Sequence, residues 1–203
     1  MRSQMRLRSW CILLIVVLGL ASACAQESAV VQAPKSWALW ESYKARFYDQ
    51  HGRIVDHDDG DRTTSEAQAY GMFFALVADD RETFDSLLRW TQSNLAAGDL
   101  TATLPAWLWG KKKNGMWGVV GANPASDADL WTSYTLLQAG ALWTEPRYTA
   151  LGKAVLALVE EQEIAALPRL EPFLLPSNNG FATQQETILN PSYVPPQIVA
   201  ALA

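Results

Sequence analysis

Two segments of the chain place carboxylates at the start of an apolar stretch. Glu66 precedes the apolar residues 67–78, and Asp127 and Asp129 precede a second apolar stretch, residues 130–141. Glycoside hydrolysis requires one carboxylic acid to protonate the leaving oxygen and a second carboxylate on the other side of the scissile bond. Acids held at the ends of two neighbouring helices could take part in that chemistry.

Helix capping is the other interpretation of the same acids. Thr63 and Glu66 have the spacing of a capping box, and Ser126 and Asp129 have it approximately. An acid in the first turn of a helix also gains about 0.3–1 kcal/mol from the helix dipole. We interpret Asp129 as such a structural cap. Capping alone does not explain why Glu66 and Asp127 begin helices that are too apolar to lie at the surface, so their acidic ends should open onto a wet space.

The sequence leaves the protonation state of Glu66 open. A general acid in a glycosidase needs a raised pKa. The N-terminus of a helix favours the charged carboxylate, whereas apolar surroundings and a nearby carboxylate favour the neutral form. Glu66 can serve as the acid only if the second pair of effects is the stronger.

An aromatic segment lies between the two acidic segments. Residues 104–124 contain Trp107, Trp109 and Trp117, three of the nine tryptophans in the chain, together with Pro and Gly. We expect a long irregular loop here, and such loops are often functional. A flat indole ring is a natural partner for the flat face of a sugar, so the loop could wall the space onto which the acids open.

The remaining pattern predicts helices that alternate between buried and amphipathic. The buried ones are residues 67–78 and the segment that begins at Ser126, and the amphipathic ones follow Asp80 and Pro146. Strand signals are weak throughout. The sequence therefore predicts an all-α protein of helical hairpins, and a double-layered toroid or an α-solenoid would each give this alternation.

The N-terminus predicts an export signal. Arginines precede an apolar run over residues 11–20, and small residues follow up to Ala25. The run is shorter than the roughly 20 apolar residues of a membrane span. We therefore expect a signal peptide at residues 1–25 and a mature domain at residues 26–203, exported to the periplasm or secreted. Cleavage removes both cysteines, Cys11 and Cys24. Lipidation of Cys24 is the alternative.

Charge and composition disfavour several other functions. Without Arg2, Arg6 and Arg8, 13 basic residues stand against 21 acidic ones, a net charge of −8. Such a surface repels nucleic acid and anionic lipid. We expect no metal or organic cofactor, because His51 and His57 lack any supporting ligand cluster and are interpreted as exposed loop residues.

Four segments in order resemble glycoside hydrolase family 8. They are TSEAQAYGM at residues 64–72, PAWLWGKK at 105–112, ASDAD at 125–129 and NPSY at 190–193. The resemblance runs from about Trp37 to the last residue and is greatest to the periplasmic endoglucanases encoded with bacterial cellulose synthase. It implies an (α/α)6 toroid that hydrolyses β-1,4-glucan, as cellulose or cello-oligosaccharides, with inversion at the anomeric carbon. The cellulose synthase machinery is an implied partner.

The resemblance also implies roles for individual residues. Glu66 matches the general acid of the family, and Asp127 matches the acid that holds and distorts the sugar at the cleavage point. The implied cleft residues are Tyr70, Trp107, Trp109 and Tyr193. For Tyr70 and Tyr193, ordinary packing explains the residue equally well.

The chain also departs from the family pattern. Members have about twice this much mature chain, and their catalytic base lies in the second half, so we expect only part of the toroid here. Residues 197–203 are apolar and helix-prone but lack a stop signal, which suggests a chain cut inside a larger domain.

Two further functions stay open from the residues. The chain could be a glucan-binding remnant without turnover, or a non-enzymatic helical scaffold. Xylan and chitosan are alternative substrates within the wider family.

Overall fold

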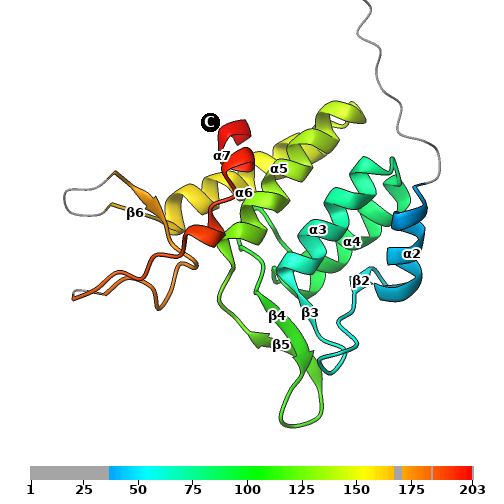
Figure 1. Ribbon diagram of the computed structural model, residues 1–203, viewed down its shortest axis with the longest axis horizontal. Coiled ribbons are helices and arrows are strands. Elements are labelled where there is room, and N and C mark those ends of the chain that lie inside the picture. Colours follow the sequence, from blue (N-terminus) through cyan, green and yellow to red (C-terminus); the bar gives the residue numbers. More distant parts are fainter. Residues whose placement is uncertain (1–36, 167–170, 184, 203) are drawn as a thin grey trace, which may run out of the picture. The chain divides into compact units, whose positions relative to one another are not determined.

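Helices and short strands alternate along the part of the chain that the computed structural model describes, residues 37–166, 171–183 and 185–202 (Figure 1). The predicted signal peptide, with Cys11 and Cys24, lies outside these residues. The helices are α2 (Ala38–Phe47), α3 (Ser65–Val77), α4 (Arg81–Asn94), α5 (Ser126–Leu142), α6 (Pro146–Gln162), the 3-10 helix η1 (Pro191–Tyr193) and α7 (Pro196–Leu202). The strands are β1 (Tyr48–Asp49), β2 (Arg53–Ile54), β3 (Thr63–Thr64), β4 (Leu108–Lys111), β5 (Trp117–Gly121), β6 (Ile164–Ala165) and β7 (Phe173–Leu174).

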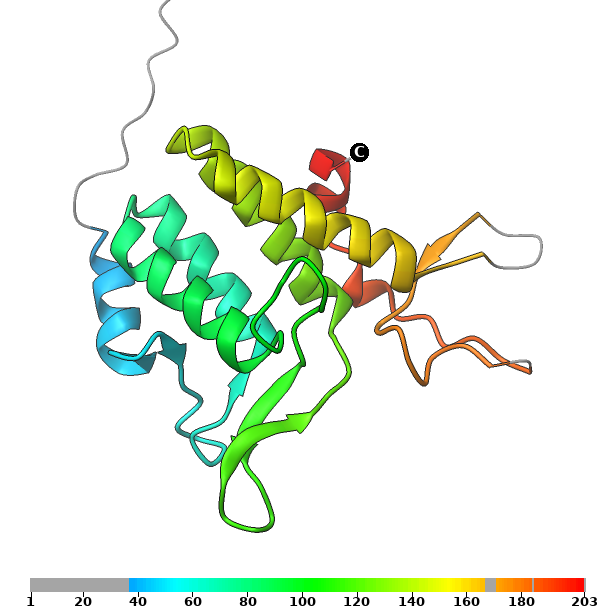
Figure 2. The ribbon, with the colours of Figure 1, turned by 180° about the vertical axis from the view of Figure 1, so that it is seen from behind.

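Two inner helices form the centre of the packing. α3 packs against α5, while α4 covers α3 and α6 covers α5, so that each inner helix forms a hairpin with an outer one (Figures 1 and 2). The outer helix α4 buries one apolar face, which includes Phe84, Leu87 and Leu88, because these residues recur at helical spacing. The predicted alternation of buried and amphipathic helices is confirmed.

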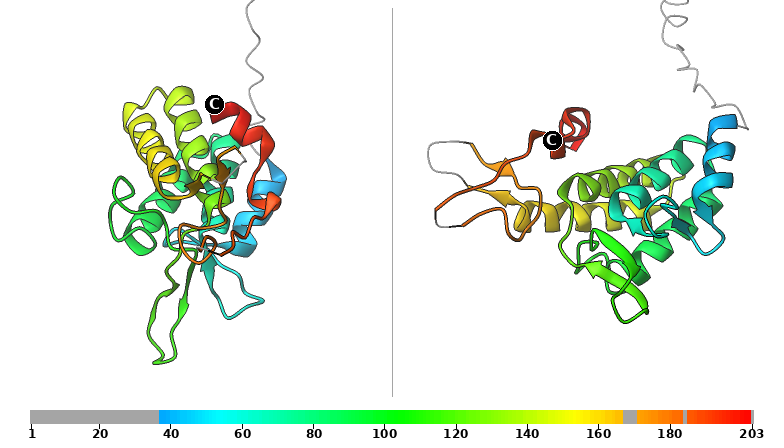
Figure 3. Two further views of the ribbon diagram at one scale, coloured as in Figure 1. Left: turned by 90° about the vertical axis from the view of Figure 1, so that its left-hand side faces the viewer. Right: turned by 60° about the horizontal axis from the view of Figure 1, so that its bottom comes forward.

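The prediction of weak strand content was wrong for the aromatic segment. β4 and β5 form an antiparallel hairpin, and β3 pairs with the other edge of β4. The turn carries Asn114 and Gly115, with Gly115 at φ +84 and the Asn114 side chain accepting a hydrogen bond from the Met116 N–H. Figure 3 shows the hairpin extending away from the helices. The chain is therefore mostly helical, with short sheets added, rather than all-α.

The start of α3 differs in one detail from the predicted capping box. Thr64, not Thr63, is the N-cap residue, and its hydroxyl accepts a hydrogen bond of 3.2 Å from the Ala67 N–H. Thr63 is instead fully buried and donates a hydrogen bond of 2.7 Å to the Ile54 carbonyl. The strand pairing of β3 takes Thr63 away from the helix end.

Asp80 connects α2 to the start of α4. It caps the helix through Thr83 and accepts hydrogen bonds from Trp40 Nε1 at 3.0 Å and Lys44 Nζ at 2.8 Å, both on α2. Burial raises the pKa of Asp80, but the hydrogen bonds from Lys44, Trp40 and Thr83 outweigh it and lower the pKa to about 2. The charged form is therefore favoured in the folded protein.

Acid should weaken the fold through Asp80. Because its folded-state pKa is below the unfolded value, its contribution is complete above about pH 4 and is lost as the pH falls towards 2. We expect Asp80→Asn to lower the free energy of unfolding by about 1–2 kcal/mol at pH 7. This is less than the full pKa shift would give, because the Asp80 side chain is partly exposed and solvent screens its interactions. Urea unfolding at pH 7 and pH 2.5 measures this. The exposed Asp58→Asn is the control, and an equal loss at both pH values would contradict the prediction.

Gly52 lies where the β1–β2 turn meets α4. Its φ is +95, and a Cβ placed there would lie 2.4 Å from the Ser86 carbonyl oxygen. Gly98 has the same φ but nothing within 4 Å of its Cβ position. Gly52→Ala should therefore lower the free energy of unfolding by about 2–4 kcal/mol, because alanine there is strained in its backbone and clashes with Ser86. Gly98→Ala should lower it by only about 1 kcal/mol, because alanine there meets only the strain of the left-handed backbone conformation. Urea unfolding measures both variants. Equal losses of unfolding free energy would contradict the prediction, because they would show that the clash with Ser86 does not destabilise the fold.

None of the helices in the described part of the chain is long and apolar enough to cross a bilayer.

Candidate active site

Glu66 lies in the first turn of α3, at a position fixed by strand pairing. The Ser65 N–H donates a hydrogen bond of 3.0 Å to the Trp107 carbonyl, and Thr64 pairs with Leu108 of β4. The Ser65 hydroxyl donates to Glu66 Oε2 at 3.3 Å. Glu66 is partly exposed, and its backbone is held against the aromatic hairpin.

Asp127 occupies the matching position in the first turn of α5. Burial raises its pKa to about 6, and the charge of Glu66 adds to that shift against the opposing hydrogen bonds from the backbone of Asp127 and Ala128. Asp127 Oδ1 is buried and has no hydrogen-bond partner among the described residues. The two acids thus lie near enough to interact, and Asp127 exchanges a proton close to neutral pH.

Tyr70 and Tyr193 lie beside Glu66 and Asp127. The pKa of each hydroxyl is raised by burial first and then by the charges of Asp127 and Glu66. Tyr70 also makes an edge contact with Trp131, with ring centroids 5.6 Å apart. Their shared surroundings place both tyrosines beside the two carboxyls.

A pocket of about 440 Å³ opens beside Asp127. Its lining residues come from α3, α5, η1 and the start of α7, and are Tyr70, Phe73, Phe74, Asp127, Trp131, Ser192, Pro195 and Gln197. Aromatic walls with one carboxylate are typical of sites that bind small polar ligands by their apolar faces. The sequence did not single out Phe73 or Trp131, although Trp131 follows Asp127 by one helical turn and that spacing is a usable signal.

Trp107 lies against small residues on both helices. It packs on Ala69 of α3 and on Ala125 and Ala128 at the start of α5. A Cβ at Gly121 would come within 2.1 Å of Trp107 Nε1, so the indole requires a glycine there. The small residues let the ring lie close to the helix ends that carry Glu66 and Asp127.

Trp109 lies in a different aromatic cluster. Its ring stacks on Trp117 with centroids 5.0 Å apart and a 19° interplanar angle, and makes an edge contact with Trp90. The Arg53 guanidinium lies 4.4 Å from the Trp109 centroid. The structure therefore brings five of the six predicted site residues together, and places Trp109 in this second cluster.

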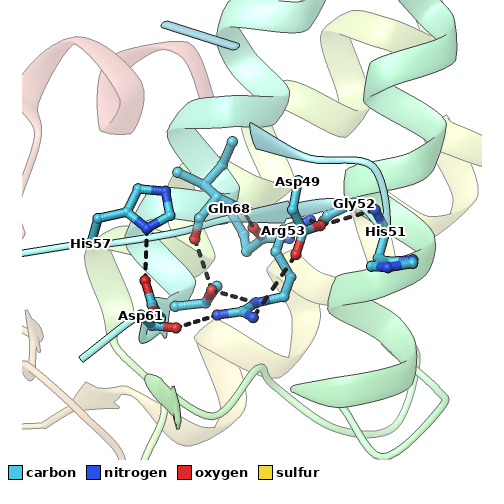
Figure 4. Close-up of polar contacts among 9 residues, drawn as sticks. Asp49, His51, Gly52, Arg53, His57, Asp61 and Gln68 are labelled. Atoms are coloured by element: carbon cyan, nitrogen blue, oxygen red, sulfur yellow. Dashed lines mark hydrogen bonds and ion pairs between the residues drawn. The ribbon is translucent and has the colours of Figure 1, made fainter. Parts of the chain in front are cut away.

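Arg53 is held by several polar contacts (Figure 4). Its Nε donates to Thr63 Oγ1 at 3.1 Å, another nitrogen donates to the Asp61 carbonyl, and Asp49 lies 3.9 Å away. The neighbouring Gln68, fully buried on α3, accepts a hydrogen bond from the Ile54 N–H at 2.7 Å and donates to the Gly52 carbonyl at 3.0 Å. These contacts fasten the β1–β2 region to the helix that carries Glu66.

Asp129 is not the structural cap that the sequence predicted. It is fully buried, neither carboxyl oxygen has a hydrogen-bond partner among the described residues, and the start of α5 has no side-chain cap. Its pKa is raised well above the usual range by burial and then by the charges of Glu163, Asp127 and Glu66. The cap prediction was wrong because the i+3 side chain points into the packed face of α5.

Glu163, directly after α6, is a second buried acid that sequence reasoning missed. It is fully buried and both its oxygens lack a partner in the described part of the chain. Burial, with a further contribution from Asp127, raises its pKa to about 8. Nothing in the sequence distinguishes it from the exposed Glu160 and Glu161 nearby.

The histidines take no part in this group. Both are exposed, as predicted, and His57 Nδ1 lies 2.7 Å from Asp61 Oδ1 (Figure 4). Within residues 37–166, 171–183 and 185–202, no three His, Cys, Asp or Glu side chains are arranged to hold a metal ion.

Comparison with known proteins gives a consistent result. The family model described as Glycosyl hydrolases family 8 matches residues 3–202. The chain is 49% identical over 169 residues to an endoglucanase of Escherichia coli (strain K12), covering 83% of this chain and 46% of the relative. It is 46% identical over 193 residues to an endoglucanase of Salmonella typhi, covering 95% of this chain and 50% of that protein.

Solved structures agree with the family match. The crystal structure of an endo-1,4-D-glucanase from Vibrio fischeri ES114 has a TM-score of 0.79 and 44% identity, over 83% of this chain and 49% of that one. A family 8 endo-β-1,4-glucanase from an Achatina fulica gut metagenomic library has a TM-score of 0.75 and 31% identity, over 84% and 53% of the two chains. The chain thus spans about half the length of the relatives it matches. By its sequence and its fold, the chain belongs to glycosyl hydrolase family 8.

Proposed function

We propose that this chain provides the proton-donor side of an inverting endo-β-1,4-glucanase. The observation that carries the proposal is the pairing of Glu66 and Asp127 in the first turns of two helices that pack against each other. Their carboxyls interact, and Trp107 and an aromatic pocket lie beside them. The relatives named endoglucanase and endo-1,4-D-glucanase supply the substrate class.

In this mechanism, Glu66 donates a proton to the glycosidic oxygen as the bond breaks. Glu66 is a partly exposed residue at the helix end, where it can reach a bound glucan. Asp127, which lines the aromatic pocket, accepts hydrogen bonds from the hydroxyls of the −1 sugar. A water activated by a second carboxylate attacks the anomeric carbon from the opposite face. We assign that base to a region matching the other half of the relatives.

We also propose that two pairs of inner and outer helices, α3 with α4 and α5 with α6, form successive hairpins of an (α/α)6 toroid. Tyr70, Trp107 and Tyr193 would contact the sugar near the cleavage point, and Trp109 would support the hairpin through its stack on Trp117. We further propose export to the periplasm or beyond by residues 1–25, where the enzyme would act on cellulose, either alone or with the cellulose synthase machinery.

The test is loss of viscosity of carboxymethylcellulose. Two proteins are compared: the full chain, and a fusion of the chain to the second half of the Escherichia coli relative. Activity of the fusion alone would support a base in the other half, and activity of both would place the base within this chain. If both proteins bind cello-oligosaccharides and neither hydrolyses them, the glucan-binding alternative is favoured.

The substrate class is tested by replacing carboxymethylcellulose with xylan in the same assay. Turnover of xylan only would overturn the glucan assignment.

A further inference from the structure

Four buried side chains near the first turn of α5 share one property. Each has a side-chain oxygen that is inaccessible to solvent and has no hydrogen-bond partner within the described residues. Asp129, Glu163 and Ser126 are 0% exposed and Ser177 is 2% exposed. Buried polar groups are almost always hydrogen-bonded, so a group of unpartnered ones calls for an explanation.

The backbone brings these side chains to one place. The Ser126 N–H donates a hydrogen bond of 3.2 Å to the Pro176 carbonyl, next to Ser177. The Leu175 N–H donates one of 2.8 Å to the Glu163 carbonyl, where β6 and β7 pair. Residues 126 and 129 are three apart on α5 and therefore share a face. Glu163 and residues 175–177 thus lie against the first turn of α5, the turn that carries Asp127.

Within the described residues, the charged groups that shift the pKa of Asp129 are all acidic. Glu66 contributes from α3, Asp127 from α5, and Glu163 from the end of α6. Tyr70 of α3 and Tyr193 of η1 lie beside the same acids. Among the described residues, neither Asp129 nor Glu163 forms an ion pair with a basic side chain. A buried carboxylate without a partner is so unfavourable that it binds a proton instead.

Protonation changes what the carboxyls can do. A neutral carboxyl has one O–H donor and keeps acceptor capacity, so it can hydrogen-bond to another carboxyl or to a serine hydroxyl. The hydroxyls of Ser126 and Ser177 lack partners in the same region. Once protonated, Asp129 and Glu163 each gain a donor that the oxygens of this region can accept.

We propose that Asp129 and Glu163 form an uncharged, hydrogen-bonded pair that positions the first turn of α5 by fastening it to residues 175–177. Both are positioning residues that act through Asp127 and do not touch the substrate. The existence of the pair is independent of the proposed glucanase function. Only its effect on turnover rests on that function.

The experiment that tests the pair is infrared difference spectroscopy of the full chain. We expect a protonated-carboxyl band at pH 7 that weakens in Asp129→Asn and in Glu163→Gln and persists in the exposed control Glu161→Gln. In the wild-type chain, part of the band should disappear as the pH passes about 8. Absence of the band at pH 7 would overturn the proposal. The wild-type titration keeps the test valid if either variant fails to fold.

A second measurement separates positioning from mere packing. In the fusion with the Escherichia coli half, turnover falls at high pH in every variant because the general acid loses its proton. We expect wild-type turnover to show an added fall of up to tenfold per pH unit above about pH 8, where Glu163 ionises. Glu163→Gln, which cannot ionise, should lack that added fall, and identical pH profiles of the two proteins would overturn the positioning role. Failure of all glucan turnover would reject the proposed function instead, and would leave the infrared result to decide on the pair.

Discussion

Replacing Glu66 by Gln should lower the rate of β-1,4-glucan hydrolysis by about 10²- to 10⁴-fold, the usual contribution of a general acid. Gln keeps the size of Glu66 and can still accept the hydrogen bond from the Ser65 hydroxyl. It cannot deliver a proton to the leaving oxygen. The measurement is kcat on cello-oligosaccharides, made on the fusion of this chain to the second half of the Escherichia coli relative.

The matched control for this variant is Glu82→Gln. Glu82 occupies the first turn of α4, as Glu66 does in α3, but it is exposed. Its replacement should leave kcat within about twofold of the wild-type value, because substitutions at exposed positions usually have small effects. An aryl cellobioside with an acidic phenol as leaving group needs little protonation, so it should recover most of the lost rate in Glu66→Gln. Equal losses on both substrates would assign Glu66 a role other than proton donation.

The helices could be predicted because their signals are local. The stripe of α4 and Pro146 at the start of α6 specify these elements without reference to the rest of the chain. The β4–β5 hairpin was missed because its strands have four and five residues and contain glycines. Asn114-Gly115 between aromatic runs was the available signal, since this pair favours the tight turns of hairpins.

The site divides in the same way. The proximity of Glu66 and Asp127 could be predicted because each begins an apolar helix, and helices of this kind pack together. Trp109 shares its segment with Trp107, yet its stacking on Trp117 and Arg53 depends on how the hairpin pairs with β3. Glu163 is recognisable only from the packing of residues 175–177 against α5, which no local pattern encodes. The positions of residues that are held by segments distant in the sequence could therefore not be predicted from local patterns.

The free energy of unfolding should fall as the pH rises from about 4.5 to 8, because of Glu163. Its folded-state pKa, about 8, lies above the unfolded value, so the folded protein holds a proton that the unfolded chain releases. Below about pH 4.5 both states are protonated and Glu163 contributes no pH dependence. Above pH 8 the cost is complete, about 3–5 kcal/mol for a shift of this size.

Glu163→Gln should remove this dependence, because Gln fills the same space and carries no proton to lose. We expect the variant to match the wild-type chain near pH 5 and to be more stable by about 3–5 kcal/mol at pH 9. Urea unfolding of the two proteins at pH 5, 7 and 9 measures the difference. The exposed Glu161→Gln should follow the wild-type curve at every pH. A Glu163→Gln variant less stable than the wild-type chain at pH 9 would mean that the ionised carboxylate is stabilised by a cation. The first turn of α5 would then be held by charge rather than by hydrogen bonds between uncharged carboxyls.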